Sequence, residues 1–218
     1  MVVLHDFDAA DESFRVQGSG RFVVWESFMV ENEAQYLRRI ESIFSDLQIP
    51  ANYSLLRGLR PYPEASGLVA ADGGNPPKLL AGEAARRWQE LRRAAAGDGI
   101  GLILVSGFRS VDRQRELIEA KLKKGDELNK ILQVLAAPGY SQHHTGLALD
   151  IGTGTNIDVT EAFEHTDAFA WLSLHAGEYG FMMPYPRGNQ YGFVYEPWHW
   201  ALETLTTPGA PTAPGTGF

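Results

Sequence analysis

The sequence predicts an α+β fold, because helical segments and short apolar strands follow one another in an irregular order. A doubly wound sheet would need the two kinds of segment to alternate. The 218 residues are enough for one sizeable domain with a subsidiary lobe. Hydrophobic residues make up 44% and charged residues 21% of the chain, as in ordinary globular proteins. That composition excludes a disordered chain, a collagen and a coiled coil.

Charge and residue content exclude further classes of protein. The formal net charge is −8, which would repel a polyphosphate. A basic cluster, Arg86-Arg87 with Arg92-Arg93, falls on a predicted helix and indicates a solvated face, so we expect no nucleic-acid partner. The absence of cysteine excludes a disulfide scaffold and a thiolate metal site. No run approaches the roughly 18 apolar residues of a membrane span.

Residues 1–12 have no basic region followed by an apolar core, so they do not predict a signal peptide. We expect a location in the cell envelope if an export signal has been removed, and in the cytoplasm if the chain is native as written. Nothing in the sequence indicates an oligomeric state.

The elements of the first half follow from local patterns. Residues 21–25 (Arg-Phe-Val-Val-Trp) predict a short strand, and 31–47 predict a helix because apolar residues recur at helical spacing. Proline and glycine indicate a loop over 57–77. A second helix is expected over 79–95, and the β-branched run 100–105 predicts a buried strand.

The second half continues in the same mixed manner. Ser110 is expected to cap a helix that begins near Val111, and a further helical segment covers 127–136. Residues 147–151 predict a strand. Asp158 and Glu161 have capping-box spacing, which predicts a helix from there to about Tyr179. Residues 193–200 are expected to be extended at first, and the Pro-, Gly- and Thr-rich tail 206–218 to be disordered.

The segment 141–150 (Ser-Gln-His-His-Thr-Gly-Leu-Ala-Leu-Asp) is the most informative for function. His143 stands seven residues before Asp150, and Gly146 permits a sharp turn into the strand between them. On a strand, Asp150 shares a face with the small side chain of Ala148, while the leucines and isoleucine face the other way. That arrangement leaves room for an ion or ligand. Taken alone, a turn and a strand with one structural aspartate is an equally good interpretation.

A second segment, Glu196-Pro-Trp-His199, adds to this pattern. Its glutamate and histidine are three residues apart and converge if Pro197 bends the chain. Two imidazoles, one carboxylate and a spare glutamate match the three ligands and one base of a catalytic zinc site. The alternative is edge-strand packing with a solvated histidine.

The pattern Ser-x-His-x-x-Gly-x-Ala-x-Asp followed by Glu-Pro-Trp-His resembles the zinc D-alanyl-D-alanine carboxypeptidases and dipeptidases of the VanY/VanX type. These belong to the lysostaphin, D-Ala-D-Ala peptidase and hedgehog superfamily. An upstream block, Ser106-Gly-Phe-Arg109-Ser110 with Gln114, also matches. The resemblance covers roughly residues 68–202. We therefore expect an N-terminal extension over 1–65, helical and irregular, a zinc peptidase domain over 66–205 and the tail.

The resemblance implies a small antiparallel sheet flanked by helices and a zinc ion held by His143, Asp150 and His199. It also implies that Glu196 is the general base and that Arg109 holds the substrate carbonyl. The residues that it places near the substrate are Ser141 and Gln114. One departure stands out, because relatives often continue with an aromatic residue and an arginine after the last histidine, whereas this chain has Trp-Ala-Leu. The contacts of that arginine are therefore in doubt here.

Other polar residues receive weaker assignments. His144 adjoins a ligand but should point away from it if the chain is extended. Three residues of the loop before Glu196 either line the cleft or serve the loop itself; these are Tyr185, Arg187 and Tyr191.

We expect from this resemblance a zinc-dependent peptidase that acts on peptidoglycan stem peptides or their fragments and releases a terminal D-Ala. Alternatives are an L-alanyl-D-glutamate endopeptidase, a D-Ala-D-Ala dipeptidase and, less favoured, a non-catalytic module that binds the cell wall or zinc.

Overall fold

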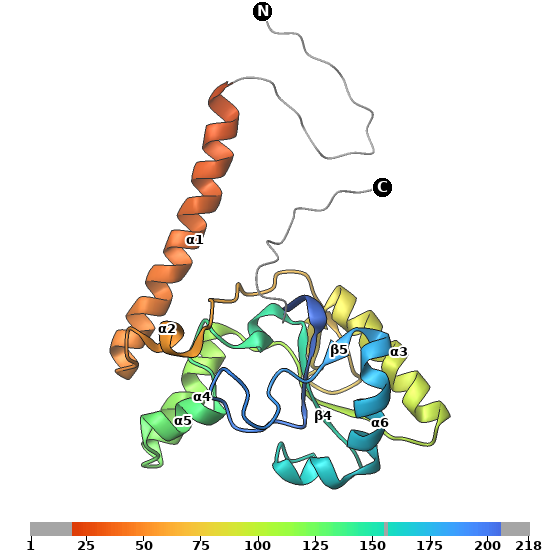
Figure 1. The fold of residues 1–218 in the computed structure, drawn as a ribbon. Coiled ribbons are helices and arrows are strands. Elements are labelled where there is room, and N and C mark those ends of the chain that lie inside the picture. The colour runs from red at the N-terminus through yellow and green to blue at the C-terminus, as the bar shows by residue number, and fades with distance from the viewer. Residues whose placement is uncertain (1–18, 155–156, 206–218) are drawn as a thin grey trace, which may run out of the picture. The chain divides into compact units, whose positions relative to one another are not determined.

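The computed structural model describes residues 19–154 and 157–205 (Figure 1). The tail predicted to be disordered lies outside these residues. The chain divides into two units, 1–43 and 44–218. The boundary lies within helix α1 (Ser19–Leu47), which confirms the helix expected over 31–47. The strand predicted at 21–25 is wrong, because these residues continue the helix. β-Branched and aromatic residues favour strands only where a neighbouring strand can pair with them.

In the second unit, the residues that the structure describes form two antiparallel sheets. The larger sheet has four strands in the order β3-β4-β6-β5, and the smaller one pairs β1 with β2. This arrangement, with helices around it, confirms the α+β fold class. The strands are β1 (Leu68–Ala70), β2 (Leu79–Ala81), β3 (Ile103–Ser106), β4 (Ala148–Gly152), β5 (Phe181–Met182) and β6 (His199–Leu202).

Helices surround the larger sheet. The α-helices of this unit are α2 (Tyr53–Arg57), α3 (Gly82–Gly97), α4 (Val111–Lys123), α5 (Leu128–Val134) and α6 (Asp167–His175). The described residues also form four 3₁₀ turns: η1 (Gln142–Thr145), η2 (Glu161–His165), η3 (Ala176–Tyr179) and η4 (Glu203–Leu205). None of the helices in the described part of the chain is long and apolar enough to cross a membrane.

Capping residues predict some helix starts correctly and others not. Ser110 caps α4 as predicted, since its side chain accepts a hydrogen bond from the Arg113 amide at 3.1 Å. The single helix predicted from Asp158 to Tyr179 is wrong, because the chain forms η2, α6 and η3 instead. Thr166 begins α6 afresh by accepting a hydrogen bond from the Phe169 amide at 3.2 Å, so no capping box at Asp158 is needed. The helix expected from residue 79 begins only at Gly82, because residues 79–81 pair as β2.

Strand alternation separates the two faces of the larger sheet. One face packs in the hydrophobic core, with α3 and α6 lying on that side of the sheet (Figure 1). The side chains that β4 and β6 contribute to the core are Leu149, Ile151, Trp200 and Leu202. The alternate positions of the same strands carry Ala148, Asp150, His199 and Ala201, all buried. The polar residues of these strands therefore gather on the face away from the core.

Candidate active site

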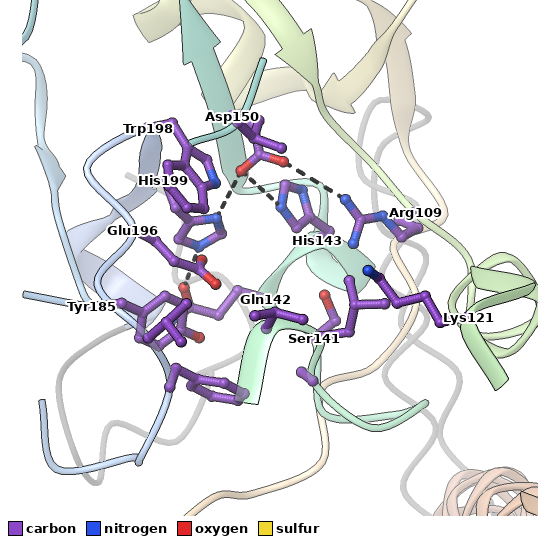
Figure 2. Close-up of a pocket in the computed structure, with 16 residues that line it drawn as sticks. Arg109, Lys121, Ser141, Gln142, His143, Asp150, Tyr185, Glu196, Trp198 and His199 are labelled. Atoms are coloured by element: carbon purple, nitrogen blue, oxygen red, sulfur yellow. Dashed lines mark hydrogen bonds and ion pairs between the residues drawn. The ribbon is translucent and has the colours of Figure 1, made fainter. Parts of the chain in front are cut away.

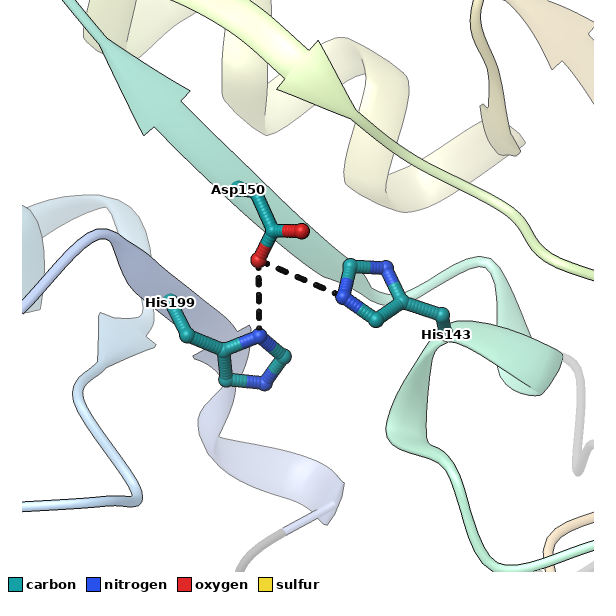
Figure 3. A group of neighbouring side chains, drawn as sticks. All are labelled: His143, Asp150 and His199. Atoms are coloured by element: carbon teal, nitrogen blue, oxygen red, sulfur yellow. Dashed lines mark hydrogen bonds and ion pairs between the residues drawn. The ribbon is translucent and has the colours of Figure 1, made fainter. Parts of the chain in front are cut away.

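Three metal-binding side chains meet where β4 and β6 pair. Asp150 lies directly opposite His199 in the antiparallel register, and His143 reaches them from η1. Asp150 Oδ1 is 3.0 Å from His199 Nδ1 and 3.3 Å from His143 Nε2 (Figure 3). One donor atom from each residue lies within 4.8 Å of the others, and all three residues are buried. The structure thus brings together the three residues predicted to hold the metal.

Gly146 makes the placement of His143 possible. It ends η1 with a φ of 65°, a left-handed conformation that favours glycine. A Cβ atom at this position would meet the backbone nitrogen of Ala81 at 2.8 Å. The chain can therefore turn from His143 into β4 only with glycine here.

The hydrogen bonds of both histidines fix which nitrogen faces the centre. His143 Nδ1 donates to the Gly107 carbonyl at 2.7 Å, which leaves Nε2 with a free lone pair. His199 Nε2 lies 3.0 Å from Gln142 Oε1 and its Nδ1 lies 3.0 Å from Asp150 Oδ1, so with a cation at the centre Nε2 would donate to Gln142 and Nδ1 would offer its lone pair. One nitrogen from each ring and a carboxylate oxygen thus face one another. This donor set fits zinc, which takes nitrogen and oxygen ligands and no thiolate here.

Burial and charge act on the protonation of two of the ligands. Burial lowers the pKa of His199, which favours a neutral ring in spite of the opposing effect of Asp150. Burial alone would raise the pKa of Asp150, but the two histidines hold it well below its usual range. Asp150 is therefore an ionised carboxylate beside a neutral His199 ring.

Glu196 lies one turn before His199 on the same loop. The His199 amide donates to the Glu196 carbonyl at 3.1 Å, so residues 196–199 form a tight turn that brings both side chains to one side. Glu196 is 8% exposed. Burial, and then the charge of Asp150, raise the pKa of Glu196 to about 8, and Arg109 opposes this shift. A carboxylate with a raised pKa beside a metal site is suited to general acid–base work.

Arg109 is held on the other side of Asp150. Its guanidinium donates to Gln114 Oε1 at 3.0 Å and to Ser106 Oγ at 3.2 Å, and lies 3.6 Å from Asp150 Oδ2. Gln114 is fully buried and donates in turn to the Ala136 carbonyl at 2.6 Å. The prediction had Gln114 near the substrate; the structure puts it behind Arg109, outside the cavity lining.

A cavity of about 330 Å³ connects these groups, within the size range of small-ligand sites (Figure 2). Ser141 lies in its wall, as expected of a residue near the substrate. The chemically active residues of the lining are Arg109, Ser141, His143, Asp150, Glu196 and His199. The remaining lining includes Lys121, Gln142 and Tyr185, of which only Tyr185 was considered from the sequence.

Of the three loop residues with weaker assignments, one lines the cavity and two do not. Tyr185 stacks on the His199 ring, with centroids 5.0 Å apart. Arg187 instead pairs with Glu161 and Glu164 on the surface, and neither it nor Tyr191 lines the cavity.

His144 points away from the metal ligands, although it lies on the 3₁₀ turn η1 and not on the extended chain on which that expectation rested. It is fully buried, its Nε2 accepts from the Gly139 amide at 3.0 Å, and its Nδ1 donates to the Arg109 carbonyl at 2.6 Å. Burial lowers its pKa to about 4. A neutral His144 therefore fixes the backbone of Arg109.

Comparison with known proteins agrees with this geometry. Residues 77–204 match the VanY family, described as D-alanyl-D-alanine carboxypeptidase. The chain is 35% identical over 141 residues to the bifunctional D-Ala-D-Ala dipeptidase and carboxypeptidase VanXYC of Enterococcus gallinarum, covering 62% of this chain and 73% of the relative. It is 38% identical over 121 residues to YodJ of Bacillus subtilis (strain 168), covering 54% and 44%. The chain thus spans less than half the length of YodJ.

Solved structures are similar as well. The LD-carboxypeptidase LdcB superposes with a TM-score of 0.58 at 32% identity, covering 64% of this chain and 69% of LdcB. A vancomycin-resistance D,D-pentapeptidase VanY in complex with Zn(II) superposes with a TM-score of 0.54 at 26% identity, covering 69% and 88%. With its motifs, sheet and metal-ligand cluster in place, the chain belongs to the VanY family of D-alanyl-D-alanine carboxypeptidases.

Proposed function

We propose that this chain is a zinc-dependent carboxypeptidase that removes the terminal D-Ala from peptidoglycan stem peptides. The observation that carries the proposal is the convergence of His143, Asp150 and His199 with a buried glutamate and a fixed arginine around one cavity. Relatives named as D-alanyl-D-alanine carboxypeptidases, and a VanY structure that contains Zn(II), support both the reaction and the metal.

The ion would be held by the two imidazoles and the Asp150 carboxylate. Zinc in such a site supplies a Lewis acid that lowers the pKa of water from 15.7 to about 7. Glu196 accepts the proton of the attacking water as the new C–O bond forms at the scissile carbonyl. It then delivers this proton to the nitrogen of the leaving D-Ala as the C–N bond breaks. Its buried position keeps bulk water from competing for the proton.

Arg109 stabilises the negative charge that develops on the carbonyl oxygen. Its guanidinium stays ionised, and its bonds to Ser106 and Gln114 hold it in place before the substrate arrives. Donors fixed in advance need no reorganisation at the transition state, which is where such groups contribute most.

Lys121 favours an exopeptidase over an endopeptidase. The cavity lining contains two permanent cations, and Arg109 already lies beside Asp150. Lys121 reaches the cavity from α4 and forms no ion pair within the described residues (Figure 2). A free terminal carboxylate would complement this charge, whereas the middle of a peptide offers no such group at the cleavage site.

The likeness to LdcB favours a second candidate, an L,D-carboxypeptidase that takes a shorter stem peptide. The two activities differ in the residue that precedes the released D-Ala. Mass spectrometry of products from a pentapeptide stem and a tetrapeptide stem, each with and without a chelator, separates them.

We expect the zinc-loaded protein to release free D-Ala from the pentapeptide, and the chelator to stop this reaction. A C-terminally amidated pentapeptide should be a poor substrate. Release of D-Ala-D-Ala, turnover of the tetrapeptide alone, or cleavage after L-Ala would each contradict the proposal and identify the other activity.

A further inference from the structure

Gln142 is a buried polar residue beside the metal ligands to which the sequence motifs assign no role. It lies between Ser141 and His143 on η1 and is 4% exposed. Its Oε1 lies 3.0 Å from Nε2 of His199, a residue of β6 that is 57 positions further along the chain. In Figure 2 the two side chains meet at the edge of the cavity. The amide therefore bridges the two segments that carry the histidine ligands.

This contact suits the tautomer of His199 that binds a metal ion. Both ring nitrogens face an oxygen at 3.0 Å, Nε2 that of the Gln142 amide and Nδ1 that of the Asp150 carboxylate. With a cation at the centre, Nδ1 would offer its lone pair to the cation, and Nε2 would then carry the hydrogen that the amide oxygen accepts. In the opposite tautomer, Nδ1 would carry a hydrogen and could not bind a metal ion.

Tyr62 holds the other side of the amide. Its side chain is hydrogen-bonded to Gln142, and its backbone nitrogen donates to the Gly139 carbonyl at 2.8 Å. Three residues later, the Ala65 amide donates to the carbonyl of His144 at 2.8 Å. These two backbone bonds tie residues 62–65 to the chain on both sides of the first metal ligand. This segment precedes the region that matches the family, residues 77–204.

We infer that Gln142 is a positioning residue for the metal centre, which orients the His199 ring with Nδ1 towards the other ligands, and that Tyr62 anchors Gln142 from outside the family-matched region. The inference rests on the zinc site of the proposed function. A neutral amide orients the ring without adding charge. A carboxylate in its place would put another negative charge into a buried site that already contains Asp150 and Glu196.

The test measures zinc affinity by competition with a chelating dye. Loss of a hydrogen-bond partner of a metal-ligating histidine typically lowers metal affinity by about 10–100-fold. We expect Gln142→Leu to weaken zinc binding by that factor. Tyr62→Phe should weaken it by less, and Tyr62→Phe combined with Gln142→Leu should add nothing further. The matched control is Gln89→Leu, which removes an amide that donates to the Ala71 carbonyl away from the site.

Two further measurements keep the test decisive if Gln142→Leu folds poorly. Gln142→Glu preserves the acceptor although it adds a buried charge, so it should weaken zinc binding less than Gln142→Leu does. In the zinc-loaded protein, ¹⁵N chemical shifts of the His199 ring should report hydrogen on Nε2, and hydrogen on Nδ1 would overturn the inference.

Equal zinc affinity in Gln142→Leu and the wild type would overturn the inference, as would equal weakening by Gln142→Glu and Gln142→Leu. These results concern the positioning role alone. The proposed function would fail separately, if the wild type bound no zinc or bound it without releasing D-Ala.

Discussion

The two faces of strands β4 and β6 differ sharply although they share one backbone. Leu149 and Trp200 lie on the core side and make apolar contacts, whereas their immediate neighbours on the same strands, Asp150 and His199, face the cavity. Both sides are buried. On the core side, burial stabilises the fold; on the cavity side, it puts polar groups into a low-dielectric site at a cost in stability. The burial of polar groups on the cavity side is explained by the chemistry of the site rather than by a contribution to folding.

Loss of a metal ligand should have the largest effect on activity. In His199→Ala we expect zinc content to fall to background and release of D-Ala to cease, because two ligands do not complete the site. The protein should remain folded, since the change lies on the cavity face. Metal analysis and a peptidase assay check this, with His165→Ala, whose side chain is 79% exposed, as the control. Full zinc occupancy in His199→Ala would show that the metal binds elsewhere.

Glu196→Gln separates metal binding from chemistry. This variant should bind zinc as the wild type does and lose roughly 10²–10⁴ in kcat, because an amide cannot take the proton of water. The control is Glu178→Gln, on the surface beside His175. Unchanged kcat in Glu196→Gln would assign the base to another residue.

Replacement of Arg109 should have a smaller effect. Arg109→Ala is expected to reduce kcat by roughly 10²–10³ with zinc content unchanged, and lysine should restore only part of it, since it lacks the planar guanidinium. The control is Arg113→Ala, whose side chain pairs with Glu116 on the exposed side of α4. An early thermal transition in Arg109→Ala with full turnover would instead show a structural role.

Burial of Glu196 on the cavity face should make the stability of the metal-free protein depend on pH. The pKa of Glu196 is raised from 4.5 to about 8 in the folded state, so above pH 4.5 the folded state binds a proton that the unfolded state has lost. Its contribution to stability therefore falls as pH rises towards 8. Buried His144, with a lowered pKa, has the opposite effect, but only below pH 6.5.

We therefore expect the free energy of unfolding to decline between about pH 6.5 and 8, by at most about 1.4 kcal/mol per pH unit. Denaturant titrations at several pH values measure this decline. In Glu196→Gln the decline should be absent, and an identical decline in both proteins would contradict the assignment.

A substitution on the core face should lower stability and leave the metal site unaffected. Leu149→Ala removes a fully buried core side chain and should cost about 2–5 kcal/mol of stability. Below the unfolding transition, kcat and zinc affinity should be unchanged. A comparable loss of zinc affinity in this variant would mean that the two faces are not separable.

The metal ligands and the base could be predicted because their motifs resemble those of the VanY/VanX-type peptidases, and part of their geometry because it is local. Strand alternation puts Asp150 and Ala148 on one face, and the spacing of Glu196 and His199 closes a turn. The parts that could not be predicted depend on pairing between distant segments. Gln142 meets His199 only because η1 packs beside β6, and neither position carries a signal of that contact.

The errors in the fold have a related origin. Residues 21–25 have strand propensity, but a helix continues through them. The stretch from Asp158 to Tyr179 carries capping signals at more than one position, and the structure uses Thr166. Gln114 lies behind Arg109 and outside the cavity lining, and its place in a motif does not indicate which of its neighbours it contacts.

A crystal structure of the zinc-loaded protein, with anomalous scattering recorded at the zinc edge, tests the central claim most directly. The account predicts one zinc peak, bound by His143 Nε2, Asp150 Oδ1 and His199 Nδ1, with Glu196 beside it and not coordinating. A peak at another site, or coordination through His199 Nε2, would contradict it.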